Sequence, residues 1–393
     1  MNVSRRTLLR GMWASGALAV AVGSRVWAEE VRNFSSVQGV GVPKRMVRIL
    51  YNENPLGSSP LALKAASEVL GAANRYPMMA NIDLLRRLHT FHDIPNTFPD
   101  NPENLSALFE ALAASPVVLG VGSTELLRST ALAYGLEGGE FIEAVPGYTE
   151  IGSAADDMLG GKVKRVKIPL TEDYHLDWQA MVKAVTPQTR LVVVTNPNNP
   201  TGTALSADAI TRLADSLDSH ILLVIDEAYI DYATDPAVTS MVNLAKTRPN
   251  VLVTRTFSKL HGLAGLRLGY AIGSPEVTSK LRRYTIGLIG TNFPAVVAAI
   301  AALDDVDFQT RSREVAQQAK AQLMAKFPAY GYAPIKSEAN FVWVNVKKDC
   351  SELVSRLARQ GIMITSGQRW QMPNYVRISV GQPAEMDALF AML

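Results

Sequence analysis

Lys259 is the residue whose setting most strongly suggests chemistry. It follows Ser258 just after the apolar run Val251–Thr254, and glycines recur at positions 262, 265 and 269. Lysine forms Schiff bases with carbonyl compounds. Most lysines are solvated surface residues, but a glycine-rich stretch with little other charge, at the end of a buried strand, favours a reactive amine.

A carboxylate and a tyrosine follow a second apolar run. Asp226 comes directly after Ile221–Ile225, and Tyr229 lies three residues later. Ligands of α/β sheets bind beyond the carboxyl ends of the strands, so these side chains are expected in the same cleft as Lys259. An aspartate that caps a following helix is the common alternative.

The string from Asn196 to Gly202, which reads Asn-Pro-Asn-Asn-Pro-Thr-Gly, follows a third apolar run, Leu191–Val194. Two prolines and a glycine make this loop rigid, so Asn199 can present a fixed amide to a ligand. A plain turn is the alternative, although a lone Asn-Pro would be far less specific than this string.

Anion-binding groups are expected near the start of a helical stretch, in Gly120-Val121-Gly122-Ser123-Thr124-Glu125. Backbone N–H groups at a helix N-terminus bind anions, and Ser123 and Thr124 add hydroxyl donors, although an ordinary helix cap is equally compatible. Ser258 and Arg267 are two further candidate donors. Tyr148, which follows the run Phe141–Val145, could stack on an aromatic ligand, or could simply be a core residue.

Together these residues meet the requirements of pyridoxal 5′-phosphate (PLP). Lys259 would form the Schiff base, and Asp226 would keep the pyridine nitrogen protonated so that the ring can act as an electron sink. Asn199 and Tyr229 would hydrogen-bond the ring oxygen. We therefore predict PLP as the cofactor and no metal site.

The apolar runs alternate with helical patterns, such as Ala207–Leu217 and Glu125–Tyr134, which predicts an α/β fold with a doubly wound, mainly parallel sheet. Beyond residue 285 the pattern changes to a smaller α+β domain, with strands at Ala339–Asn345 and Tyr375–Val380 and a helix at Ser351–Gln360. The predicted organisation is a signal peptide (1–28), an N-terminal arm that packs with the small domain (29–50), a large cofactor-binding domain (51–285) and a small domain (286–393).

The order of these strings resembles that of the aminotransferase class I/II family of PLP fold type I, from about Leu50 to the C-terminus. The string Asn52-Glu53-Asn54-Pro55-Leu56-Gly57 and the pair Gly265-Leu266 resemble the histidinol-phosphate aminotransferase subgroup. The resemblance implies that Arg377 binds the substrate α-carboxylate and that Tyr76 reaches the cofactor phosphate of a partner subunit, hence a homodimer. Alternation along its strand places Arg377 with Tyr375 and Ser379 on one face.

Two positions depart from that subgroup. It usually carries arginines that suit a substrate phosphate where this chain has Asn345 and Thr365. Arg369 and Lys347 are nearby basic residues, but neither occupies the matching position. We therefore expect the amino-acid-like substrate to carry a carboxylate rather than a phosphate.

The first 28 residues have the order of a twin-arginine signal peptide: Arg5-Arg6, a short apolar stretch, and Val26-Trp27-Ala28 as a cleavage site. This segment holds four arginines and no acid; without it, 35 of the 39 basic residues remain against 36 acidic ones, a net charge of −1 rather than +3. That balance gives no reason to expect nucleic-acid binding or a membrane anchor after cleavage. Cys350 is the only cysteine, so no intrachain disulfide can form.

The sequence thus predicts a periplasmic transaminase that is exported by the twin-arginine translocase and acts on an amino acid and a 2-oxo acid. Other PLP reactions, such as β-elimination or decarboxylation, and histidinol-phosphate transamination proper remain alternatives. A sensor built on the same fold is disfavoured, because no helix-turn-helix segment precedes the domain.

Overall fold

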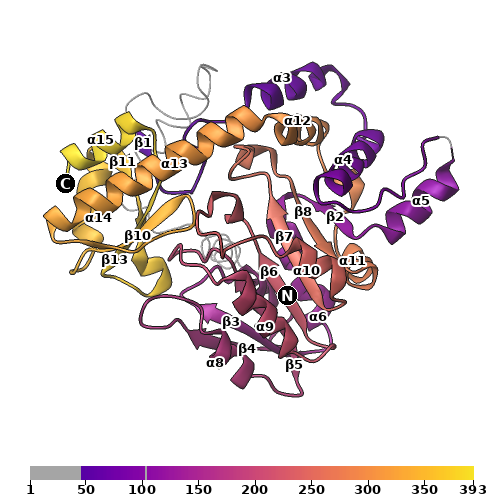
Figure 1. Cartoon of the computed structure of the whole chain (residues 1–393), viewed down its shortest axis with the longest axis horizontal. Helices are drawn as coiled ribbons and strands as arrows, with labels where there is room; N and C mark the ends of the chain where they lie inside the picture. Colours follow the sequence, from indigo (N-terminus) through magenta and orange to yellow (C-terminus); the bar gives the residue numbers. More distant parts are fainter. Residues whose placement is uncertain (1–45, 102–103) are drawn as a thin grey trace, which may run out of the picture.

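A seven-stranded sheet forms the larger part of the computed structural model, which describes residues 46–101 and 104–393 (Figure 1). Its strand order is β2-β8-β7-β6-β5-β3-β4, and β8 alone runs antiparallel to its neighbours in this sheet. The predicted mainly parallel α/β sheet is therefore confirmed. The strands are β2 (Val117–Gly120), β3 (Gly139–Val145), β4 (Val163–Pro169), β5 (Thr189–Thr195), β6 (Leu222–Asp226), β7 (Val251–Thr256) and β8 (Gly269–Gly273).

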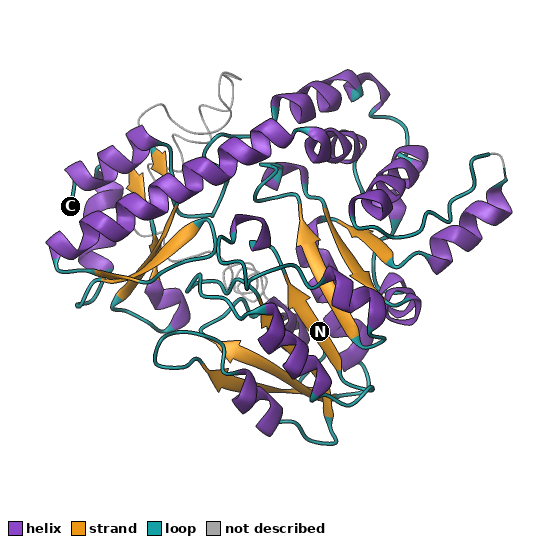
Figure 2. Ribbon diagram, viewed as in Figure 1, coloured by secondary structure: helices purple, strands orange, loops and turns teal. Residues whose placement is uncertain are grey.

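Helices cover both faces of this sheet (Figure 2). Successive residues of a strand point to opposite faces, and in β6 Leu223 packs in one hydrophobic cluster while Leu222 packs in another. Both clusters are apolar, which explains why these strands read as uninterrupted hydrophobic runs. The helices around the sheet are α3 (Pro60–Glu68), α4 (Met78–Phe91), α5 (Leu105–Ala114), α6 (Gly122–Gly135), α7 (Glu150–Met158), α8 (Trp178–Lys183), α9 (Ala207–Asp215), α10 (Val242–Thr247), α11 (Pro275–Arg282) and α12 (Phe293–Asp304).

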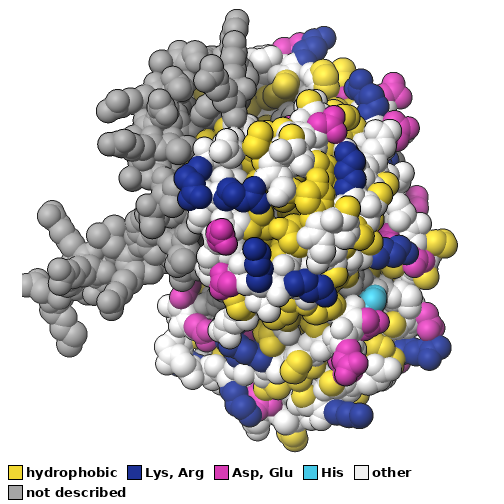
Figure 3. All heavy atoms as spheres, turned by 90° about the vertical axis from the view of Figure 1, so that its left-hand side faces the viewer, with side chains coloured by type: hydrophobic (Ala, Val, Ile, Leu, Met, Phe, Trp, Pro, Cys, Tyr) yellow, Lys and Arg dark blue, Asp and Glu magenta, His cyan; other side chains and the backbone are white. Residues whose placement is uncertain are grey.

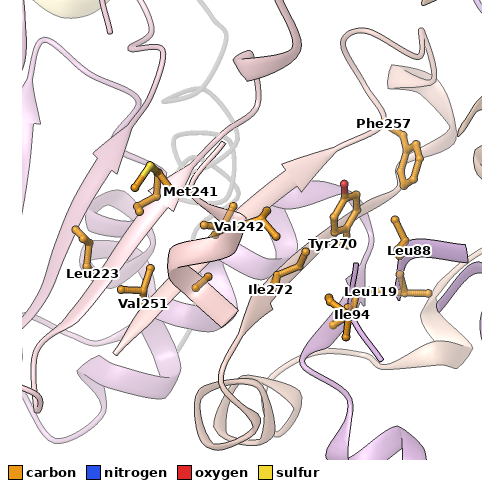
Figure 4. Packing of buried hydrophobic residues seen from close by; sticks show 14 of the residues in the cluster. Leu88, Ile94, Leu119, Leu223, Met241, Val242, Val251, Phe257, Tyr270 and Ile272 are labelled. Carbon is orange, nitrogen blue, oxygen red and sulfur yellow. The ribbon is translucent and has the colours of Figure 1, made fainter. Parts of the chain in front are cut away.

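The larger of these clusters joins strands to helices that are distant in sequence (Figure 4). Leu88 of α4, Tyr270 and Ile272 of β8, and Val242 of α10 all belong to this cluster. Phe257, which is fully buried, lies two residues before Lys259. Its packing anchors the segment that carries the predicted catalytic lysine.

A second, smaller sheet lies beside the first, in the order β12-β13-β10-β9, and all its pairings are antiparallel. Val376 and Ile378 point into the small hydrophobic core, so Arg377 points to the other face, as the predicted alternation requires. The remaining elements are β9 (Ala333–Pro334), β10 (Phe341–Asn345), β11 (Ile362–Met363), β12 (Thr365–Ser366), β13 (Tyr375–Ser379), α13 (Val306–Lys326), α14 (Ser351–Arg359) and α15 (Pro383–Ala391).

The N-terminal arm joins this smaller part. β1 (Val47–Arg48) pairs in parallel with β11, and Ile49 is fully buried in the small core. Residues 29–45 of the predicted arm and the predicted signal peptide lie outside the described residues. The predicted boundary at residue 286 falls before α12, whose buried residues Ala295 and Val296 belong to the large core. Beyond this boundary, the first residue of the small core is Ala316, within α13.

The surface of the small part carries charges of both signs around a hydrophobic stretch (Figure 3). Over residues 46–101 and 104–393, no helix combines the length and apolarity needed to cross a bilayer.

Candidate active site

Three neighbouring strands bring the predicted catalytic residues together. β5, β6 and β7 are parallel, and Asp226 at the end of β6 lies in register with Thr195 on one side and Thr254 on the other. Asn199 and Lys259 follow the ends of the two flanking strands within four residues. Because carboxyl ends of parallel strands meet at one edge of the sheet, residues that are 60 positions apart in sequence share one cleft.

Asp226 is almost fully buried, and Thr254 Oγ1 donates a hydrogen bond of 2.9 Å to its Oδ1. Burial raises the pKa of Asp226 to about 6, while the hydrogen bond from Thr254 opposes this rise. No α-helix begins at Asp226, so it is not a helix cap. A buried carboxylate of this kind is suited to pair with a protonated ring nitrogen.

The amine of Lys259 is deprotonated more readily than that of an ordinary lysine. Burial lowers the pKa of Lys259 to about 8, and the positive charges of Arg377 and Arg267 act in the same direction. Its Nζ donates a hydrogen bond of 3.0 Å to the Tyr51 carbonyl and lies 5.7 Å from the centre of the Tyr229 ring. A neutral amine is the nucleophilic form that Schiff-base chemistry requires.

Tyr229 and Asn199 form a hydrogen-bonded pair beside this lysine. Asn199 Nδ2 donates to the Tyr229 hydroxyl at 3.5 Å, and Asn52 Nδ2 donates to the same hydroxyl at 3.0 Å. Asn199 Oδ1 in turn accepts a hydrogen bond of 2.7 Å from Arg377 Nη1. A chain of polar contacts therefore connects the residues predicted to bind the ring oxygen with the one predicted to bind the substrate.

The start of α6 and Arg267 form a cradle of anion-binding groups. A Cβ atom on Gly122, whose φ is +73°, would lie 2.3 Å from Arg267 Nη2, and one on Gly269 would lie 2.5 Å from the Ser123 nitrogen. Only glycine allows this close approach. The residue that precedes α6, Val121, has no capping side chain, and its backbone N–H donates to Glu125 Oε2 at 2.5 Å, so the hydroxyls of Ser123 and Thr124 do not serve as caps.

Ser258 and Tyr148 are two further predicted cofactor residues. Ser258 is buried directly beside Lys259. Tyr148 follows β3, its hydroxyl is hydrogen-bonded by Thr124, and burial raises its pKa, with the negative charge of Asp226 acting in the same direction. Tyr148 is thus close to both the anion-binding helix start and the buried carboxylate, between which a phosphorylated pyridine ring would extend.

Arg377 is a buried cation without an acidic partner in the described part of the chain. It is 5% exposed, and its Nη2 donates to the Leu50 carbonyl at 2.6 Å and to Thr365 Oγ1 at 3.3 Å. Its guanidinium lies over the rings of Phe341 and Trp370, and burial lowers its pKa to about 10. Its Nε has no hydrogen-bond partner. The burial and the lowered pKa distinguish Arg377 from an ordinary surface arginine.

Tyr76 is not part of this cluster. It is 77% exposed and makes no hydrogen bond within residues 46–101 and 104–393. Its predicted role toward a partner subunit stays a prediction.

Several contributors to the site were not assigned a role from the sequence. Asn52 belongs to the string that suggested the subgroup, but its contact with Tyr229 has no sequence signal. The backbone carbonyls of Leu50 and Tyr51 also contribute, and because every residue has a carbonyl, the sequence could not single them out. Trp370, beside Arg377, could have been noticed only as an aromatic next to Arg369.

Comparison with known proteins agrees with this geometry. Residues 51–393 match the family model described as aminotransferase class I and II. The chain belongs to this family. It is 35% identical to histidinol-phosphate aminotransferase 2 of Pseudomonas aeruginosa over 351 residues, which cover 89% of each chain. It is also 35% identical over 357 residues to histidinol-phosphate aminotransferase of Moorella thermoacetica, which covers 89% of this chain and 85% of that one.

Solved structures show the same relationship. Histidinol-phosphate aminotransferase of Sinorhizobium meliloti in complex with PLP superposes with a TM-score of 0.77 at 28% identity, covering 88% of this chain and 89% of that one. Aspartate aminotransferase of Thermus thermophilus with maleate shares the fold, with a TM-score of 0.75 at 21% identity, covering 99% of this chain and 98% of that one. The aminotransferase is therefore a PLP enzyme of fold type I.

The residues present fit PLP. The anion cradle at Gly122, the buried carboxylate of Asp226 and the lysine with a lowered pKa provide one partner each for the phosphate, the ring nitrogen and the aldehyde.

Proposed function

We propose that this enzyme transfers the amino group of a carboxylate-bearing α-amino acid to a 2-oxo acid, and that it does so in the periplasm. The observation that carries the substrate class is Arg377, a buried guanidinium without an acidic partner in the described residues. A buried charge is costly unless it is paired. The α-carboxylate of a substrate would supply the missing charge as a bidentate partner.

Each side chain of this site has a separate role in the proposed reaction. Bound PLP supplies the electron sink that makes the α-proton of an amino acid removable. Asp226 holds a proton on the ring nitrogen, and Lys259, as a neutral amine, accepts the α-proton on Nζ. Between proton transfers this amine can donate to the Tyr51 carbonyl, as it does at 3.0 Å in the structure. Arg377 fixes the orientation of the substrate through its fork of donors.

Histidinol phosphate is the second candidate substrate, because the relatives quoted above carry that name. The two positions expected to hold phosphate-binding arginines instead hold neutral side chains that already have partners. Asn345 Nδ2 donates to the Tyr375 hydroxyl at 2.9 Å, and Thr365 Oγ1 donates to the Leu50 carbonyl at 2.7 Å. The exposed Arg369, stacked against Trp370, is a remaining cation near Arg377. We therefore expect histidinol phosphate to be a poor substrate.

A screen of half-reactions tests the substrate class. The purified holoenzyme is mixed with single amino acids or with histidinol phosphate, and the absorption spectrum of the cofactor is followed as it acquires the amino group. We expect one or more α-amino acids to convert the cofactor to its aminated form with a higher second-order rate constant than histidinol phosphate does. The reverse order would refute the proposed substrate class, and loss of carbon dioxide or of a β-substituent would identify another PLP reaction.

The proposed compartment is supported by residues 1–28, which lie outside the described residues, and by the single cysteine of the chain. The twin-arginine route accepts folded proteins, so PLP could be bound before export. The mature chain would then not need disulfides for stability in an oxidising compartment.

The proposed homodimer is supported by the position of Tyr76, whose large exposed ring lies between α3 and α4. If Tyr76 completes the phosphate site of the partner, the variants Tyr76→Ala and Lys259→Ala should complement each other. A mixed dimer would then contain one site with neither substitution. Regained activity after mixing and refolding the two variants would support shared sites, whereas no gain would contradict them.

A further inference from the structure

Three consecutive residues, at the junction of the N-terminal arm and the large domain, contact the site, and each of them meets a different functional side chain. Leu50 O accepts from Arg377 Nη2 at 2.6 Å, Tyr51 O accepts from Lys259 Nζ at 3.0 Å, and Asn52 Nδ2 donates to the Tyr229 hydroxyl at 3.0 Å. Of these, only the Asn52 contact comes from a side chain, so it can be altered by substitution without removing the backbone.

Asn52 is held in one orientation. It is 1% exposed and adopts a left-handed backbone conformation, with φ of 56°. Its backbone N–H donates to Ser379 Oγ at 2.8 Å, and Ser379 Oγ donates back to Asn52 Oδ1 at 2.8 Å. Asn340 Nδ2 donates to the Asn52 carbonyl at 3.0 Å. With its oxygen occupied by Ser379, the amide presents its N–H₂ group to Tyr229.

The hydroxyl oxygen of Tyr229 accepts N–H groups from two sides. The amide of Asn199 is fixed independently of Asn52, because its Oδ1 faces Arg377, and a guanidinium can only donate. Its Nδ2 therefore also faces the Tyr229 oxygen. A phenol has one proton to donate, and with both amides directed at the oxygen as donors, that proton must point elsewhere.

We propose that Asn52 is a positioning residue for amino transfer: by donating to the Tyr229 oxygen, it directs the Tyr229 proton to the ring oxygen of bound PLP. This inference rests on the proposed function, because it requires PLP to occupy the cleft. Donation from Tyr229 stabilises negative charge on that ring oxygen. The oxygen then attracts the neighbouring proton on the Lys259 nitrogen less strongly, so that proton is lost at a lower pH.

Asn52→Gly is the most direct variant, because glycine tolerates a positive φ and lacks the amide. The measurement is the pH at which the visible absorption band of the bound cofactor changes in the holoenzyme. We expect this midpoint to rise by about 0.5–1 pH unit, the size expected for loss of one hydrogen bond. Ser379→Ala, which releases the Asn52 oxygen, should shift the midpoint in the same direction but by less, and it provides a second variant if Asn52→Gly does not fold.

Asn54→Ala is the matched control. Asn54 is a buried asparagine two residues after Asn52, and its Nδ2 donates to the Leu260 carbonyl and to Ser312 Oγ rather than to Tyr229. This variant should lower the melting temperature but leave the absorption midpoint in place. When Tyr229 is already changed to Phe, adding Asn52→Gly should not shift the absorption midpoint again, because Asn52 acts through the Tyr229 hydroxyl.

The outcomes separate the inference from the proposed function. A wild-type enzyme that binds PLP but does not exchange amino groups would contradict the proposed function. If the wild-type enzyme exchanges amino groups but neither Asn52→Gly nor Ser379→Ala shifts the absorption midpoint, the proposed role of Asn52 would be overturned. A shift of equal size in the Tyr229→Phe background would also overturn it, because the effect would then not pass through Tyr229.

Discussion

Arg377→Ala removes the buried guanidinium to which we assign the substrate carboxylate. In the wild type this side chain already donates to Asn199 Oδ1, the Leu50 carbonyl and Thr365 Oγ1, so it is held in place before substrate arrives. A pre-oriented fork loses little rotamer freedom when the carboxylate binds. The substitution should therefore reduce binding in the transition state as well as in the ground state.

The expected size follows from the loss of one partner of a buried charged pair, which costs about 2–5 kcal/mol. On the usual relation between barrier and rate, kcat/KM for an α-amino acid should fall by about 30- to 5,000-fold. Arg377→Lys keeps a positive charge but not the fork, so its loss should lie between wild type and Arg377→Ala.

Steady-state kinetics with the best amino acid from the half-reaction screen provides the assay, with cofactor content and melting temperature measured in parallel. Arg369→Ala is the matched control, because Arg369 is also a cation over Trp370 but is exposed. It should change kcat/KM for a simple α-amino acid by less than about threefold, as expected for a surface charge. If Arg377→Ala retained full PLP and lost less than threefold in kcat/KM, the assignment of the carboxylate site would be wrong.

The remaining predictions concern the lysine, the phosphate positions and export. Lys259→Ala should abolish turnover and the borohydride-trapped cofactor adduct, and an adduct retained at another lysine would show that Lys259 was wrongly assigned. Because burial and neighbouring cations lower the pKa of Lys259 to about 8, the rate at which apoenzyme takes up PLP covalently should rise with pH through about 8 rather than 10.5. Introducing arginine at Asn345 and Thr365 together should increase kcat/KM for histidinol phosphate relative to α-amino acids; an unchanged ratio would mean that these positions do not determine specificity. Changing Arg5 and Arg6 to lysine should leave the precursor in the cytoplasm, and undiminished periplasmic accumulation, measured by cell fractionation, would contradict twin-arginine export.

The large sheet could be predicted well from the sequence, because a strand that is buried on both faces forms an apolar run of neighbouring residues. The runs before Asn196 and Asp226 are apolar without interruption, as expected for strands covered on both faces, and the structure places them at β5 and β6. The small domain was harder to delimit. α12 is apolar along almost its whole length, which indicates a buried helix but not the part that buries it, and its packing against α3 and α4 shows that it belongs to the large core.

By itself the sequence determined which residues could do the chemistry and on which strand ends they lie. Residue type decides whether a side chain can form a Schiff base, hold a proton or bind an anion, and parallel strands bring their carboxyl ends to one edge. Only the tertiary structure decided the pKa values and the hydrogen-bond partners of these groups. The pKa of Lys259 depends on burial and on Arg377, which is more than 100 residues away, and the Leu50 carbonyl meets Arg377 across 327 positions of sequence. The backbone carbonyl is the same in every residue type, so a local sequence pattern cannot predict its contacts. These contacts follow from the way in which the N-terminal arm packs against the two sheets.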